Sequence, residues 1–287
     1  MTEFVLQLLA NGLSNGVGYA FVALGLTLVF GVLHVINFAH GEVFMVGALA
    51  ALLGTRWGLP YLATLPLAVL AGVALGALLD RVCVAPLLAR SHDKSEVLLA
   101  TFAASIIVFE AVFVSFGAQA ENVPGIPGVW TAGGVAVPWQ RVFVLGAGIV
   151  VLVAMELLLR RTAFGVQLRA VAQSAFAARV VGIRVQRVNS LTFVLASAIA
   201  GLGGALLAPV ILYSPQIGHA VIIKAFVVVV MGGLGSVRGA VVFGVLLGVV
   251  EALAGAFMSE GFAAAAIYAL MLVTLLWRPH GLMGRAA

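Results

Sequence analysis

The chain has 287 residues, of which 63% are hydrophobic and only 9% are charged, and its mean hydropathy is +1.22. About a quarter of the residues in a soluble domain are charged, so this composition excludes an ordinary soluble protein and indicates an integral membrane protein. The net charge of +5 comes from basic residues in loops beside apolar segments, which is typical of membrane-topology signals and disfavours nucleic acid as a partner.

Apolar segments long enough to cross a bilayer as helices, about 20 residues each, recur along the chain. They are expected at 4–30, 36–54, 61–79, 97–117, 141–159, 190–212, 220–231, 240–257 and 262–277. The segment 220–231 is short for a span and is a candidate for a re-entrant or discontinuous helix. The sequence therefore predicts an all-α, polytopic helical bundle with eight or nine transmembrane segments, in a single membrane domain over residues 1–287.

The distribution of basic residues predicts the orientation of this bundle. With nine crossings the N-terminus lies outside, and the loops 80–96, 160–189 and 232–239 lie in the cytoplasm with the tail from Arg278. These regions hold Arg81, Arg90, Lys94, the arginines of the 160–189 loop, Arg238, Arg278 and Arg285, against Arg56, Arg141 and Lys224 outside. The positive-inside rule favours this arrangement. The external loop at about 118–140 is rich in proline and glycine and is expected to be poor in helix, either as a docking surface or as a plain connector.

Glycine and polar residues interrupt the hydrophobic sequence at Gly31–Gly47 and at Met231–Gly248. Irregular backbone at membrane depth is tolerated where it is buried in protein or lines a cavity, so both breaks are candidates for a transport pathway. The spacing of His34, His40 and Glu42 does not match a zinc site. Capping of helix ends is favoured for these residues over direct contact with a solute or a neighbouring subunit.

Glycine pairs four residues apart predict close helix packing in lipid. The pairs are Gly12 and Gly16, Gly72 and Gly76, Gly235 and Gly239, and Gly244 and Gly248.

Glu110 and Glu251 are the only acidic residues well inside predicted spans. A proton-coupled carrier would need such residues, but two isolated carboxylates favour a structural hydrogen-bonding role. Glu156 lies four residues before Arg160, which predicts an ion pair on one helix face.

The loop at 160–189 carries six arginines and no carboxylate. It is predicted to form one short helix over Phe164 to Gln173 and a second over Ala175 to Val181, with Ser174 as the N-cap and Gly182 as the left-handed end. Apolar stripes on both helices favour docking to a cytosolic partner over a basic helix that lies on lipid. Because the sequence has no phosphate-binding loop, nucleophile elbow or metal-spaced cluster, we expect no enzymatic activity and no cofactor, and energy supplied from outside the chain.

Three motifs together resemble the membrane permeases of branched-chain amino acid ABC transporters. They are INFAHGE at Ile36–Glu42, FGVQLRAVAQSAFAARVVGI at Phe164–Ile183 and MGGLGSVRGAVVFG at Met231–Gly244. The first motif is similar to the permease type that carries this sequence rather than to its paired sister permease. The resemblance implies an importer half in a bacterial inner membrane, with a second homologous permease, two cytosolic ATP-binding subunits and a periplasmic solute-binding protein.

The resemblance also assigns residues. ATPase-contact positions would be Gly165, Arg169, Ala170, Gln173, Ala178 and Gly182, and the translocation region would be shaped by Asn37, His40, Gly41, Glu42, Gly232, Gly233 and Gly235. Ser174 stands where an acidic residue is expected. The implied solute is leucine, isoleucine or valine. Urea, short-chain amides or other amino acids in the same architecture, a proton-coupled carrier, a passive channel and a scaffold without transport remain the alternatives.

Overall fold

The structure is a computed structural model that describes residues 2–90, 93–132, 134–278 and 281–284, so Arg285 lies outside the described residues. Helices dominate these ranges, which confirms the all-α expectation. The elements are α1 (Thr2–Leu33), α2 (His40–Arg56), α3 (Tyr61–Leu79), the π-helix η1 (Asp80–Val84), α4 (Ala85–Arg90), α5 (Lys94–Phe116), β1 (Val129–Ala132), β2 (Val135–Pro138), α6 (Trp139–Arg161), α7 (Ala163–Gln173), α8 (Ala175–Val180), α9 (Val185–Leu207), α10 (Ile217–Gly232), α11 (Val237–Phe257) and α12 (Glu260–Trp277).

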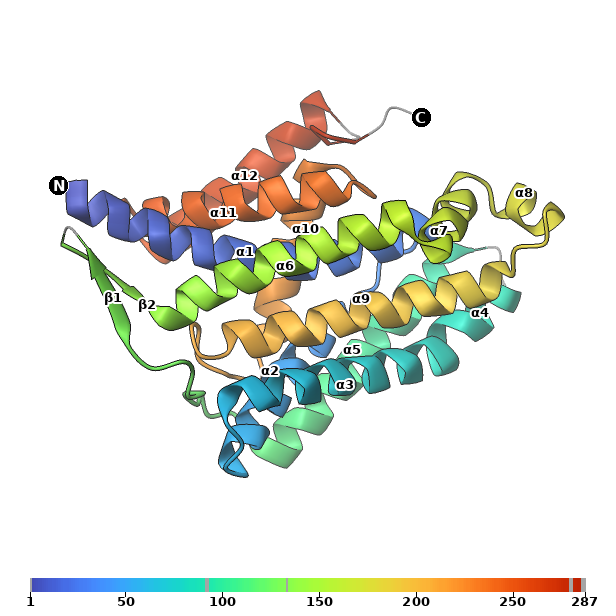
Figure 1. The fold of residues 1–287 in the computed structure, drawn as a ribbon. Coiled ribbons are helices and arrows are strands. Elements are labelled where there is room, and N and C mark those ends of the chain that lie inside the picture. Colours follow the sequence, from blue (N-terminus) through green and yellow to red (C-terminus); the bar gives the residue numbers. More distant parts are fainter. Residues whose placement is uncertain (1, 91–92, 133, 279–280, 285–287) are drawn as a thin grey trace.

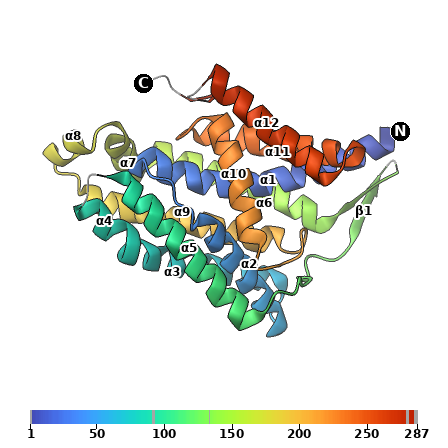
Figure 2. The same ribbon diagram turned by 180° about the vertical axis from the view of Figure 1, so that it is seen from behind.

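The long helices run between two ends of the molecule (Figures 1 and 2). The N-terminus and the β1–β2 hairpin lie at one end, and α4, α7 and α8 lie at the other. Helices α1 and α9 are largely buried, whereas α5, α6 and α11 leave most of their apolar surface exposed. The core is therefore built around α1, α2, α9 and α10, and the outer helices present apolar faces for lipid or for another membrane subunit.

The expected number of spans is too high by the length criterion. Within the described ranges, six helical units are at least 18 residues long and apolar enough to cross a membrane, and α2, α10 and the described part of α12 are shorter. Residues 34–37 are not helical, so the segment expected from residue 36 starts only at His40. Helix α10 has 16 residues and is about 24 Å long, less than the roughly 30 Å of a hydrocarbon core.

One predicted loop differs from the structure, and one basic residue has a partner that the topology argument did not include. Residues 80–90, expected as part of a cytoplasmic loop, continue α3 through η1 into α4. Lys224, placed outside by the topology argument, is inside α10. Its side chain is paired with Glu251 of α11, which allows a lysine to stand in an apolar helix.

The loop at about 118–140 is poor in helix, as expected, and contains the antiparallel β1–β2 hairpin. Gln140 fixes it to the bundle: the amide oxygen accepts from the backbone N–H of Ile126 at 3.1 Å, and the amide nitrogen donates to Tyr61 Oη at 2.8 Å. At the hairpin, the Ala136 N–H donates to Gln7 Oε1 of α1 at 2.9 Å. This loop is therefore a held structure and not a free connector.

The glycine pairs of α1 and α11 pack against each other. A Cβ atom at Gly12 would lie 2.8 Å from the carbonyl oxygen of Gly248, and one at Gly244 would lie 2.8 Å from the Cα of Ala20. No other residue type has room at these crossings. The expected small-residue packing in lipid is confirmed for this pair of helices.

Candidate functional site: two glycine-rich breaks and a protruding helical loop

The helical loop between α6 and α9 has the predicted local structure. Ser174 accepts a hydrogen bond at its Oγ from the Ala177 N–H at 3.2 Å and so caps α8. Gly182, at φ +86°, ends the turn after α8 in the left-handed conformation that favours glycine. Both the two-helix pattern and its capping residue are therefore confirmed.

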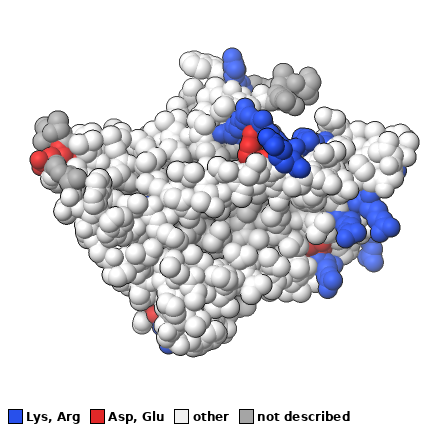
Figure 3. Space-filling model, viewed as in Figure 1, with Lys and Arg blue, Asp and Glu red and all other residues white. Residues whose placement is uncertain are grey.

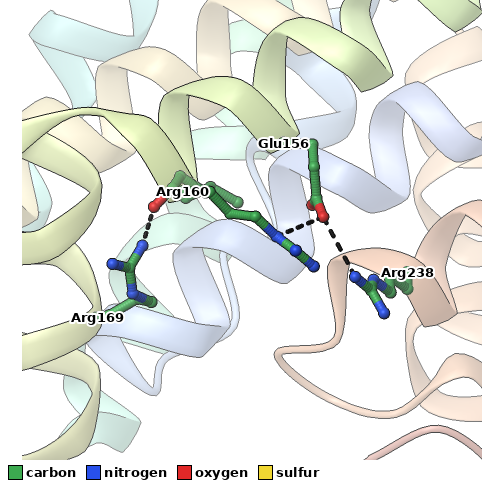
Figure 4. A network of polar contacts seen from close by, with 5 residues as sticks. Glu156, Arg160, Arg169 and Arg238 are labelled. Carbon is green, nitrogen blue, oxygen red and sulfur yellow. Dashed lines mark hydrogen bonds and ion pairs between the residues drawn. The ribbon is translucent and has the colours of Figure 1, made fainter.

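Helix α7 folds back onto the end of α6. Thr162 caps α7 by accepting from the Gly165 N–H at 3.1 Å, and a Cβ at Gly165 would lie 2.3 Å from the carbonyl oxygen of Leu159. Arg169 donates to that same carbonyl oxygen (Figure 4). Helix α7 is consequently held against the end of a long membrane helix.

The six residues that the resemblance assigns to ATPase contact divide into two groups. Gly165 and Ala178 are buried within the chain and Ala170 is half-buried, so these three position the loop. Arg169, Gln173 and Gly182 are exposed. The structure thus leaves only part of the assigned set free to meet a partner.

The free surface of α8 is apolar. The exposed fractions of Phe176, Val180 and Val181 are 77%, 72% and 75%, so the apolar side chains of this short helix point away from the protein. Figure 3 shows basic side chains over the same end of the molecule. Exposed apolar side chains with basic neighbours are typical of a surface that is covered by another protein.

Glu156 connects the end of α6 to the start of α11. Its Oε1 lies 2.6 Å from Arg160 Nε, which confirms the predicted ion pair, and 3.3 Å from Arg238 Nη2 (Figure 4). Arg238 belongs to the second glycine-rich break. The loop and that break therefore meet at one carboxylate.

Two open cavities lie at this end of the molecule. Their volumes are about 1240 and 1020 Å³, and both are lined by His34, Ala172 and Gln173. His34 has φ +55°, a left-handed backbone that is uncommon for a residue other than glycine. The start of the first break therefore stands between the two cavities, beside α7.

The rest of the first break is buried. Asn37 accepts at its Oδ1 from the Ala39 N–H at 3.0 Å in the turn before α2. Helix α2 has no side-chain cap from the described residues, so the capping expected of His40 and Glu42 is not found at this helix start. His40 and Glu42 have exposed fractions of 0% and 1%. A Cβ at Gly41 would lie 2.4 Å from the carbonyl oxygen of Gly218, so only glycine lets the first turns of α2 and α10 cross.

This crossing places His219 of α10 beside Glu42. Nδ1 of the imidazole lies 3.2 Å from Oε1 of Glu42, and the imidazole ring contacts the ring of Phe109 on α5 edge-on at 5.0 Å between centroids. Sequence reasoning missed His219. The signal was present in the dipeptide Gly218–His219 at the start of the short helix, since a glycine there marks a close helix contact.

The second break lies at the other end of α10. Gly233 and Gly235 have φ +100° and +86° in the turn to α11, and a Cβ at Gly232 would lie 2.5 Å from the carbonyl carbon of Gly239. A Cβ at Gly31 would lie 3.3 Å from the Cα of Gly235, so this turn packs against the end of α1. The translocation residues expected as one group thus form two groups, separated by the length of α10.

The two intramembrane acids have different surroundings. Glu251 is paired with Lys224 and accepts from Tyr19 Oη at 2.6 Å, which fits the expected structural role. Glu110 is exposed on α5, on the face opposite the buried residues of this helix.

Among the described residues, no group of three or more histidine, cysteine, aspartate or glutamate side chains has metal-binding geometry.

Buried glycine-crossed helices, two breaks at the ends of one short helix and a protruding helical loop define a polytopic membrane permease. Residues 8–276 match the family described as "Branched-chain amino acid transport system / permease component", and the chain belongs to this family.

Several curated relatives align over nearly the whole chain. The high-affinity branched-chain amino acid transport system permease protein BraD of Pseudomonas aeruginosa is 32% identical over 98% of this chain and 96% of its own length. LivH of Escherichia coli K12, with the same description, is 31% identical over 98% and 96%. The probable branched-chain amino acid transport permease protein LivH of Methanocaldococcus jannaschii is 30% identical over 92% and 87%. The resemblance identified from the three motifs is confirmed.

Proposed function

We propose that this chain is one permease subunit of an ABC importer for leucine, isoleucine and valine in a bacterial inner membrane. A second homologous permease completes the channel, two cytosolic ATP-binding subunits drive it, and a periplasmic solute-binding protein delivers the solute. Family membership and the names of the relatives support the transport class and the solute. The chain itself is the membrane subunit and leaves ATP hydrolysis to its partners.

The observation that carries the coupling proposal is the exposed apolar surface of α8. Burying a side chain the size of Phe176 is favourable by roughly 1.5–3 kcal/mol, and within the described chain α8 leaves this side chain open. The ATP-binding subunit is the occupant that we infer, because Arg169, Gln173 and Arg179 around this surface are exposed and can pair with acidic or polar groups on that partner.

The proposed mechanism follows from the contacts of the loop. ATP binding brings the two ATP-binding subunits together and displaces α8 and α7. Arg169 and Gly165 pass this displacement to the end of α6, and Glu156 passes it to Arg238 at the second break. Gly232, Gly233 and Gly235 then act as the bending region of the turn, while Asn37, His40, Gly41 and Glu42 shape the pathway at the other end of α10.

The test uses the assembled transporter in nanodiscs with its solute-binding protein. Phe176→Ser should reduce co-purification of the ATP-binding subunits and leucine-stimulated ATP hydrolysis by at least about tenfold, because the loss of one buried aromatic anchor is worth more than 1.4 kcal/mol. Val166→Ser in α7 is the matched control, since Val166 is also exposed but outside α8. Normal assembly and normal ATP hydrolysis in Phe176→Ser, and in Arg169→Glu with Arg179→Glu, would contradict the coupling proposal.

A further inference from the structure

The imidazole of His219 lies beside a row of aromatic side chains on α5. Helix α5 carries Phe102, Phe109 and Phe113 at spacings of seven and four residues, which places them along one side of the helix. Phe102 contacts Phe38 of the first break edge-on at 5.9 Å, and Phe109 contacts His219 at 5.0 Å, both between ring centroids. Among the described residues, His219 is the polar side chain whose ring contacts this aromatic side.

The imidazole of His219 contacts Glu42 and is otherwise largely exposed at the surface of the chain. The exposed fraction of its side chain is 49%, whereas that of Glu42 is 2%. A helix of apolar residues has little reason to expose an imidazole to lipid, because a polar side chain at membrane depth faces a cavity, water or another protein chain. The exposed imidazole therefore indicates a surface that is not lipid-facing in the assembled protein.

The buried carboxylate behind His219 is incompletely paired. Glu42 Oε2 and Tyr213 Oη are buried, and neither has a hydrogen-bond partner among the described residues. Within the described ranges, no lysine or arginine forms an ion pair with Glu42. A buried carboxylate that lacks a cationic partner attracts positive charge to the nearest accessible point, and this point is the imidazole.

The contact with Glu42 also fixes the hydrogen-bonding character of the imidazole. The 3.2 Å approach of Nδ1 to Oε1 is attractive when Nδ1 carries the proton. In this tautomer of the neutral ring Nε2 is an acceptor. An ammonium group, which only donates hydrogen bonds, is the complementary partner.

We propose that Glu42 and His219 form an ammonium-accepting subsite for an amine-bearing solute, beside the aromatic side chains of α5. This inference rests on the proposed function and deepens it, since it assigns the polar contact of the pathway to His219 and the apolar contact to Phe109. It also separates α-amino acids from urea and amides, which carry no ammonium group.

The test measures charge selectivity at a cysteine placed in the subsite. Cys83 is the only cysteine of the chain, so Cys83→Ser removes background labelling and His219→Cys introduces a single thiol next to Glu42. The complete transporter is labelled in membranes with trimethylammonium-ethyl and sulfonato-ethyl methanethiosulfonates, which are of similar size and opposite charge. Each rate is divided by the rate of the same reagent with a free thiol in solution.

The normalised rate of the cationic reagent should exceed that of the anionic reagent by about tenfold, because a carboxylate within a few ångströms acts in a medium of low dielectric constant. The matched control is His219→Cys with Glu42→Gln, in which this ratio should fall to about one. Leucine with its solute-binding protein should slow the cationic labelling, and isovalerate, which lacks the amino group, should not.

A ratio near one in His219→Cys, or a ratio that Glu42→Gln leaves unchanged, would overturn the subsite. If His219→Cys prevents assembly, Ile223→Cys, one turn further along α10 and exposed, carries the same comparison with and without Glu42→Gln. Labelling needs neither ATP nor uptake, so a charge ratio of one with normal ATP-driven uptake counts against the subsite alone. Absence of ATP-driven uptake in the unmodified transporter counts against the proposed function.

Discussion

Tyr19 of α1 donates its hydroxyl proton to Glu251 of α11 across 2.6 Å, although 232 residues separate the two in sequence. Lys224 of α10 completes the cluster, since its ammonium group pairs with the same carboxylate and donates to Tyr19 Oη at 3.0 Å. Lys224 and Glu251 neutralise each other, and together with Tyr19 they join three helices. An intramembrane acid that is paired in this way is a structural element and a poor proton carrier.

Removing one charge from this cluster should cost more than removing both. Glu251→Gln leaves the partly buried Lys224 without its counter-charge, and we expect the free energy of unfolding to fall by roughly 1–3 kcal/mol, less than for a fully buried pair that loses one partner. Lys224→Met combined with Glu251→Met should recover most of this loss. Thermal unfolding in one detergent compares the stability of the unmodified subunit, Glu251→Gln and the double variant. Equal losses of stability in the single and double variants would contradict the pairing.

The crossing of Gly41 and Gly218 gives a second prediction. Gly41→Ala places a methyl group 2.4 Å from the Gly218 carbonyl oxygen and 2.8 Å from the Ile222 Cβ, so α2 and α10 must separate. Overpacking of this kind costs about 1–3 kcal/mol, and we expect lower thermal stability together with loss of uptake. Gly255→Ala in α11 is the control, because a Cβ there meets no other part of the described chain within 4 Å. Unchanged uptake in Gly41→Ala would show that the crossing has no role in transport.

The parts of this structure that depend on local sequence could be predicted. Ser174 and Gly182 have chemical roles that neighbouring residues determine, and the Glu156–Arg160 pair follows from a spacing of four residues. The number of spans was wrong because hydropathy measures how apolar a segment is and not where its helix begins. Helix α2 starts at His40 because residues 34–37 are not helical and residues 38 and 39 form a turn.

Contacts between distant segments could not be predicted. Lys224 was counted with the outside basic residues, and its pairing was missed because its partner, Glu251, belongs to another helix. His219 was missed because its neighbours, Glu42 and Phe109, come from two other helices. In each case the role of a polar residue depends on which helix crosses its own. Glycines allow such crossings, but the sequence alone does not show which two helices meet.

The cap at Ser174 predicts how the docking helix is held. Ser174→Ala removes the acceptor of the Ala177 N–H, and loss of an N-cap side chain destabilises a helix by about 1 kcal/mol. A helix as short as α8 should then exchange its amide hydrogens faster, and the ATP-binding subunits should bind several-fold more weakly. Ser174→Asp keeps an acceptor and provides the acidic residue that the family resemblance leads us to expect. Hydrogen exchange and co-purification should therefore return to the original values in Ser174→Asp, and equal behaviour of the two variants would exclude the cap as the cause.

Glu110 provides the test between an ATP-driven importer and a proton-coupled carrier. Glu251 is neutralised by Lys224, so of the two acids that the sequence places well inside the spans, Glu110 is the one that a proton relay would need. It lies about 24 Å along α5 from Lys94 and about 9 Å from Phe116. Its side chain is on the exposed face of α5, where a second permease or water at the membrane surface can solvate it.

We expect Glu110→Gln to retain at least about half of the leucine uptake, since the substitution keeps the size and polarity of the side chain. ATP depletion should stop uptake in both proteins, and a proton uncoupler should leave uptake unchanged in vesicles that are supplied with ATP. If Glu110→Gln abolishes uptake while ATP hydrolysis and assembly stay normal, and if the uncoupler stops the unmodified protein, the energy comes from protons and the coupling role of α8 must be abandoned.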